Sequence, residues 1–142
     1  MKLAIALLAV LCGVAACAPK PAQPTAFDAA HEACAFCRMT GSDGRAAAQL
    51  VTPGEEPLFF DDIGCLSDYV NQHGRKENAV AFVTDYDTRA WVRADVAAFV
   101  RQPSIDTPMG SHLLAFASPS SRDAAAAAKG GTPVGVNDIL KR

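Results

Sequence analysis

Apolar side chains occur along this chain in short blocks, and their spacing predicts small strands and helices. In the first half, apolar runs and alternating positions predict three strands, at residues 45–52, 57–60 and 79–84. After the second strand, Asp61-Asp62 can cap a helix, and Gly74 can end it. The apolar face of this helix consists of Ile63, Leu66, Tyr69 and Val70.

The second half of the chain gives a similar order of elements. Two apolar segments predict strands, at residues 88–94 and 111–117. Between them, Asp95 can cap a short helical turn, whose apolar side chains are Val96, Phe99 and Val100. A helix is predicted to open at Pro119, to run through five alanines and to end at Gly130-Gly131, before a last strand at 132–136.

The order strand, strand, helix, strand thus occurs twice, at about 45–84 and at 88–136, although the two stretches share little sequence. We therefore predict an α+β fold in which two small ββαβ units pack together.

The N-terminal segment has the pattern of an export signal. Lys2 precedes an apolar run that is shorter than the roughly 20 residues needed to span a bilayer, and small residues precede Cys17. This pattern resembles a lipobox, so residues 1–16 are expected to be a signal peptide and Cys17 to become a lipidated N-terminus at a membrane. The alternative is an ordinary secretory signal that is cleaved nearby. Residues 17–26 are rich in Pro and Ala and are expected to form a flexible tether, which leaves residues 27–142 as the folded domain.

Charge and cysteine content narrow the range of functions. The chain has 13 basic and 15 acidic residues without a Lys/Arg cluster, which argues against nucleic-acid binding. No phosphate loop, dinucleotide fingerprint or nucleophile elbow is present. Outside the leader, three cysteines remain, Cys34, Cys37 and Cys65. Because an odd number cannot all pair in an oxidising compartment, at least one thiol is unpaired or bound to something else.

Soft metal ligands gather in the segment Cys34-Ala35-Phe36-Cys37-Arg38-Met39. Thiolate and thioether sulfur together suit Cu(I) better than zinc, which prefers four Cys or His ligands. A distant Met109 lies between proline and glycine, outside any apolar period, and His112 follows it. A loop methionine packed on the core is the simpler alternative for Met109.

Cys65 and the pair Asp61-Asp62 have structural explanations that are simpler than a role in chemistry. Cys65 at the edge of a helical apolar face is expected to be a buried small hydrophobe, with a disulfide to Cys34 or a reserve ligand as alternatives. Asp61 and Asp62 could form an acid/base pair, but capping of the helix explains at least one of them.

Taken together, the segments CAFCRM, RAAAQL, LFFDDIGCLSDYV, FVTDYDTRAWVRADVAAFV and TPMGSHLLAF resemble the NosL family of nitrous oxide reductase accessory lipoproteins. The resemblance covers nearly all of the domain, from about Cys34 to Ala117. It implies a periplasm-facing Cu(I) chaperone, not an enzyme, that serves the copper centres of nitrous oxide reductase beside an ABC-type transporter. It also implies a fold of two ββαβ units related to the organomercurial-lyase fold.

The resemblance places the family's cysteine on Cys37 and its methionines on Met39 and Met109. Cys34 or His112 is then expected as a fourth or exchanging ligand. The family usually has glycine where this chain has Arg38, which puts a cation near the site. Two rival functions are a thiol–disulfide oxidoreductase that uses Cys34 and Cys37, and an organomercurial-lyase-like enzyme.

Overall fold

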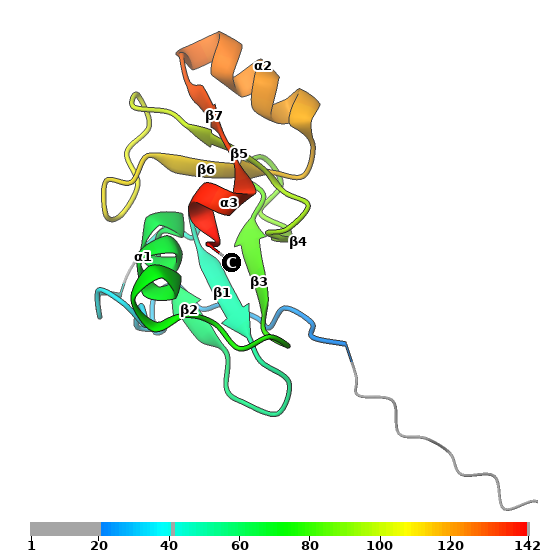
Figure 1. Ribbon diagram of the computed structural model, residues 1–142. Coiled ribbons are helices and arrows are strands. Elements are labelled where there is room, and N and C mark those ends of the chain that lie inside the picture. The colour runs from blue at the N-terminus through cyan, green and yellow to red at the C-terminus, as the bar shows by residue number, and fades with distance from the viewer. Residues whose placement is uncertain (1–20, 41, 142) are drawn as a thin grey trace, which may run out of the picture.

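The computed structural model describes residues 21–40 and 42–141 as a mixed α+β fold with two antiparallel sheets (Figure 1). The predicted fold class is therefore confirmed. In chain order the elements are β1 (Ala48–Val51), β2 (Leu58–Phe60), α1 (Ile63–His73), β3 (Val80–Thr84), β4 (Trp91–Arg93), β5 (Ala98–Arg101), β6 (Leu113–Phe116), α2 (Pro119–Lys129), β7 (Thr132–Val134) and α3 (Val136–Ile139).

The first sheet has the strand order β2-β1-β3-β4, and α1 packs on it. α1 begins where the sequence predicted, because the side chain of Asp62 accepts a hydrogen bond from the backbone N–H of Gly64. It ends at Gly74, which has a positive φ of 71°. The apolar face of α1 and the inner face of the sheet enclose the main core, where Phe60, Ile63 and Leu66 have no exposed surface.

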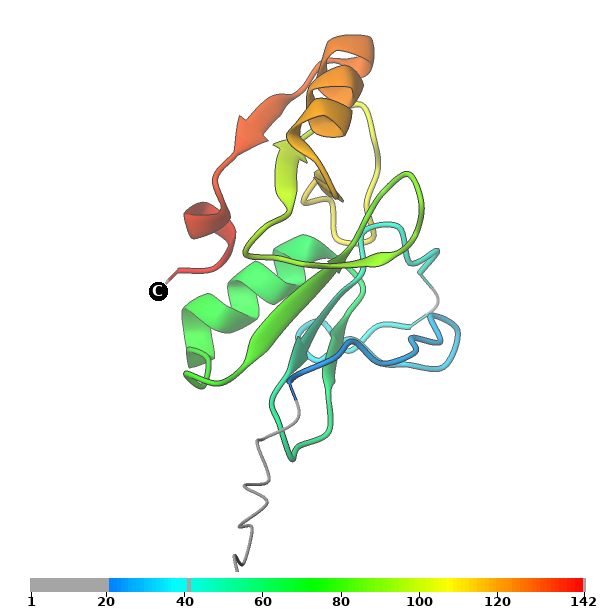
Figure 2. The same cartoon turned by 90° about the vertical axis from the view of Figure 1, so that its right-hand side faces the viewer.

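The second sheet has the order β6-β5-β7, and α2 packs on it (Figure 2). Both units thus place their first strand in the centre, with the second strand and the strand after the helix on either side. The units β1-β2-α1-β3 and β5-β6-α2-β7 therefore have the same strand arrangement. α3 follows β7 and returns to pack on α1.

The structure differs from the sequence prediction between residues 88 and 101. The strand predicted at 88–94 was expected to open the second unit, but β4 pairs with β3 and completes the first sheet. The predicted helical turn after Asp95 is wrong beyond residue 96, because Phe99 and Val100 lie in β5. β5 is paired on both sides and buried on both faces, so its apolar run resembles a helical period as much as a strand.

The buried carboxylate of Asp85 joins the two sheets. Asp85 forms a parallel bridge with Ala115 of β6, and its Oδ2 accepts a hydrogen bond of 2.9 Å from the backbone N–H of Ala117. Its Oδ1 accepts hydrogen bonds from the backbone N–H groups of Asp87 and Thr88, in the turn that follows β3. One side chain therefore fixes both the turn after β3 and the contact between the units.

The N-terminal part of the domain is held by Gln49, which is fully buried in β1. Its amide oxygen accepts hydrogen bonds from the backbone N–H and the hydroxyl of Thr25, and its amide N–H donates to the carbonyl oxygen of Thr25. The chain is thus bound to the domain inside the segment predicted as a tether. The predicted signal peptide, 1–16, and lipidated Cys17 lie outside the described residues. No helix among the described residues has the length and apolar character needed to cross a membrane.

Candidate metal centre

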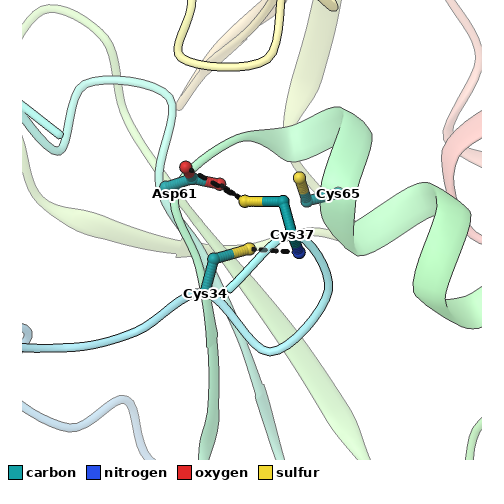
Figure 3. Close-up of side chains that lie close together, drawn as sticks. All are labelled: Cys34, Cys37, Asp61 and Cys65. Atoms are coloured by element: carbon teal, nitrogen blue, oxygen red, sulfur yellow. Dashed lines mark hydrogen bonds between the residues drawn. The ribbon is translucent and has the colours of Figure 1, made fainter. Parts of the chain in front are cut away.

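Three thiols and one carboxylate converge beside the N-terminus of α1 (Figure 3). One ligand atom from each of Cys34, Cys37, Asp61 and Cys65 lies within 4.8 Å of every other. The Sγ of Cys37 lies 3.5 Å from both carboxylate oxygens of Asp61, and the backbone N–H of Cys37 donates to the Sγ of Cys34 at 3.5 Å. All three cysteines are free thiols.

Three separate segments bring these side chains together. The turn 34–39 is anchored to the end of β2 by a hydrogen bond from the backbone N–H of Ala35 to the carbonyl oxygen of Phe59. Asp61 follows β2 directly, and Cys65 lies in the first turn of α1. The positive end of the helix dipole therefore faces the sulfur atoms and favours negatively charged groups there.

The backbone of the turn 34–39 explains why glycine suits the position that Arg38 occupies in this chain. The N–H of Arg38 donates to the carbonyl oxygen of Cys34, and the N–H of Cys34 donates to the carbonyl oxygen of Met39. This closed turn gives Arg38 a φ of 67°, which glycine adopts freely and an L side chain only at a cost of about 1 kcal/mol. Arg38 thus keeps the conformation for which glycine is best suited, at some cost in stability.

Burial raises the pKa of two of the thiols, Cys37 and Cys65. Burial raises the pKa of Cys37, an effect that the backbone N–H of Met39 partly offsets and that Cys34 and Asp61 increase. Burial raises the pKa of Cys65 strongly, and the charges of Cys34 and Asp61 add to the shift. Both thiols therefore hold their protons at neutral pH, and a metal ion that binds them must displace these protons.

Asp62 links this end of α1 to the loop that carries Met109. Its Oδ2 accepts a hydrogen bond of 2.9 Å from the backbone N–H of Met109, and its Oδ1 accepts one from the hydroxyl of Ser111 as well as one from Gly64. Gly64 has to be glycine here, because a Cβ at this position would lie only 2.6 Å from the Cβ of Ser111. The 102–112 loop is thus held against the same helix end beside which the thiols lie.

The two methionines and His112 lie differently from the thiols. Met39 and Met109 are each 46% exposed, and together with Val96 they are the exposed large hydrophobic residues of the described chain. The Nδ1 of His112 lies 2.8 Å from the carbonyl oxygen of Ile105, which can only accept, so Nδ1 carries a proton. In the neutral ring this leaves Nε2 with the lone pair that a metal ion needs.

The structure thus brings Cys34 and Cys37 together, and it fastens the Met109 loop to Asp62, the neighbour of Asp61. It also adds two side chains, Asp61 and Cys65, for which the sequence suggested simpler explanations. Asp62 is the helix cap, as the sequence allowed, and this leaves Asp61 free to face Cys37. The available signal was the position of Asp61 directly before the helix cap and of Cys65 in the first helical turn.

Two comparisons with known proteins found matches. A family model described as NosL matches residues 24–142. The crystal structure of the copper chaperone NosL from Shewanella denitrificans is similar to this chain with a TM-score of 0.72 and 20% sequence identity, over 86% of this chain and 98% of that one. No curated protein matches. Since the family model covers nearly the whole described domain, this chain belongs to the NosL family.

Proposed function

We propose that this protein is a membrane-anchored carrier of Cu(I) that supplies copper for the assembly of nitrous oxide reductase. The observation that carries the proposal is the anchoring of the Met109 loop by Asp62, because it links a loop with a thioether donor distant in sequence to the helix start beside which the Cys37 thiol lies. The copper chaperone from Shewanella denitrificans, which has a similar fold, supports the choice of metal.

The proposed Cu(I) ligands are the thiolate of Cys37 and the thioethers of Met39 and Met109, with Cys34 or His112 as a fourth or exchanging ligand. These donors are soft and suit Cu(I). Cys37 is only partly buried, whereas Cys34 is 1% exposed. Cys37 is therefore the motif thiol that an incoming ion or acceptor can reach.

Exposed thioethers suit a carrier. Because Met39 and Met109 are both half-exposed, an acceptor can replace them one at a time without unfolding the site. A thioether is a weaker ligand than a thiolate, so the ion can pass to a site richer in His or Cys by ligand exchange.

The route and location rest on the family resemblance. We propose that Cys17 is lipidated, that the domain faces the periplasm, and that an ABC-type transporter encoded with nitrous oxide reductase works beside it. A lipid anchor of more than one chain would keep the carrier at the membrane where such a transporter lies.

A Cu(I) titration against a chromophoric chelator tests the ligand set. Replacing Cys37, Met39 or Met109 by alanine should each weaken Cu(I) binding by at least about tenfold. Val96→Ala is the matched control, since it shortens an exposed apolar side chain (67% exposed) away from the site. Unchanged affinity in both Cys37→Ala and Met109→Ala would exclude this ligand set.

A thiol–disulfide oxidoreductase is the rival function, and two observations weigh against it. Burial raises the pKa of Cys37, whereas a redox cysteine needs a lowered one. Its partner Cys34 is closed off from solvent. Reduction of insulin by the purified protein, with turnover, would favour the rival.

A further inference from the structure

The four-donor cluster at the start of α1 differs from the Cu(I) ligand set in composition. It shares Cys37 with that set, and Cys34 where this residue serves as the fourth copper ligand, and it adds Cys65 and an oxygen ligand, Asp61. A carboxylate oxygen is a poor partner for Cu(I) but a normal ligand of zinc, alongside cysteine sulfur. Three thiols and one carboxylate also match the four ligands that a closed zinc site requires.

The spacing of the donors fits one tetrahedral ion. Zn–S bonds of about 2.3 Å place two sulfur ligands about 3.8 Å apart, and a sulfur and an oxygen about 3.5 Å apart. The Sγ of Cys37 already lies 3.5 Å from the carboxylate of Asp61, and no pair in the cluster exceeds 4.8 Å. A shift of about 1 Å therefore brings even a pair at that limit to tetrahedral spacing.

The carboxylate of Asp61 points independently to a cation. It is 5% exposed, yet the described residues offer it no salt bridge and only one hydrogen-bond donor, the thiol of Cys37. A thiol is a weak donor. Asp62 beside it has backbone N–H and hydroxyl partners for both of its oxygens. A buried carboxylate with so little compensation is costly unless a cation binds there.

We propose that Cys34, Cys37, Asp61 and Cys65 form a second metal site, which binds Zn(II) tetrahedrally. Because four protein ligands fill the tetrahedron, the bound ion has no open coordination position, and Cys34 and Cys65 are almost fully buried. Because both sites use Cys37, the chain holds either Zn(II) here or Cu(I) at the methionine site. This mutual exclusion rests on the proposed function, whereas the zinc site itself does not.

The experiment uses the full chain, purified in detergent and stripped of metal under reducing conditions. Zn(II) is titrated against a chromophoric chelator, and Co(II) replaces it for absorption spectra. Asp61→Asn keeps the side-chain volume and removes the charge, and Asp68→Asn, on the exposed face of α1, is its matched control. Cys65→Ala is the second variant, and circular dichroism checks that each variant is folded.

The proposal expects one Zn(II) per chain and tetrahedral Co(II) spectra with sulfur-to-metal charge transfer. Asp61→Asn and Cys65→Ala should each weaken Zn(II) binding by roughly 100-fold. Asp68→Asn, Met39→Ala and Met109→Ala should leave it unchanged. Octahedral Co(II) spectra, or equal Zn(II) affinity in Asp61→Asn and Asp68→Asn, would overturn the zinc site.

The same variants separate this inference from the proposed function. Cu(I) affinity should fall in Met39→Ala and Met109→Ala and persist in Asp61→Asn. If this copper pattern holds while Zn(II) binding fails, only the zinc site is refuted. If Zn(II) binds as expected while Cu(I) affinity is unchanged in Met39→Ala and Met109→Ala, the proposed copper ligand set is refuted instead.

Discussion

Replacing Asp62 by asparagine should release the Met109 loop while keeping helix α1 capped. Oδ1 of Asp62 accepts hydrogen bonds from Gly64 and Ser111, and Oδ2 accepts only from Met109. The single amide oxygen of the substituted side chain will therefore stay with the two donors, and its NH₂ will face the N–H of Met109. Asparagine and aspartate cap helices about equally well, so the variant should keep the helix cap and lose the hydrogen bond to the Met109 loop.

The size of the effect follows from the lost bond. A hydrogen bond to a charged group contributes about 1.5–3 kcal/mol, and a buried donor left without an acceptor costs a similar amount. We expect Asp62→Asn to lower the free energy of unfolding by about 2 kcal/mol. Cu(I) affinity should fall by about three- to tenfold, because the Met109 loop must then be ordered when the ion binds.

Urea unfolding and Cu(I) titration measure the two effects. Asp68→Asn is the control and should stay within about 0.5 kcal/mol of the unchanged protein. In a Met109→Ala background, Asp62→Asn should have no further effect on Cu(I) affinity, since Asp62 acts on copper only through Met109. An additive loss in the double variant, or an unfolding free energy that does not change in Asp62→Asn, would refute the reasoning.

Three further changes test other parts of the structure. Gly64→Ala should lower the midpoint of thermal unfolding and cost about 1–3 kcal/mol, despite the better helix propensity of alanine, because its Cβ would lie 2.6 Å from the Cβ of Ser111; a stabilised variant would contradict this contact. Asp85→Asn should cost about 2 kcal/mol in urea unfolding, since its NH₂ would face the N–H of Ala117; an unchanged value would mean that this bond does not hold the sheets together. The folded chain keeps the proton of Cys65 above pH 9.0, whereas the unfolded chain loses it there. The free energy of unfolding is therefore unaffected by this thiol below that pH, and above it the free energy falls by about 1.4 kcal/mol per pH unit. Cys65→Ala should remove that slope from urea unfolding of metal-free protein, and an equal slope in both proteins would contradict the burial argument.

Local signals in the sequence predicted most of the first unit. The cap at Asp62, the stop at Gly74 and the run at 79–84 each specify an element through their own residues. The apolar run of β5 did not, because a short stretch that is buried on both faces shows no alternation. The pairing of β4 with β3 could not be predicted either, since alternation predicts a strand but not the strand with which it pairs.

The candidate metal centre likewise has residues that the sequence predicted and residues that only the tertiary structure brings to it. The CxxC spacing and Met39 are local, and the sequence placed them together. Asp61 and Cys65 reach the thiols only because β2 and α1 pack against the turn 34–39, which is tertiary information. The family resemblance predicted the metal ligands but gave no sign of the carboxylate. The ligand assignments and the kinship with the organomercurial-lyase fold stay predictions.

The hydrogen bonds between Thr25 and Gln49 also limit how far the folded domain can lie from a lipid attached at Cys17. If Cys17 holds the lipid, as we propose, only the eight residue steps from 17 to 25 separate the membrane from the domain. Fully extended, they span at most about 28 Å. A domain held in this way would exchange copper only with partners whose sites lie within that distance of the membrane, and a soluble reductase would have to come to the membrane to be loaded.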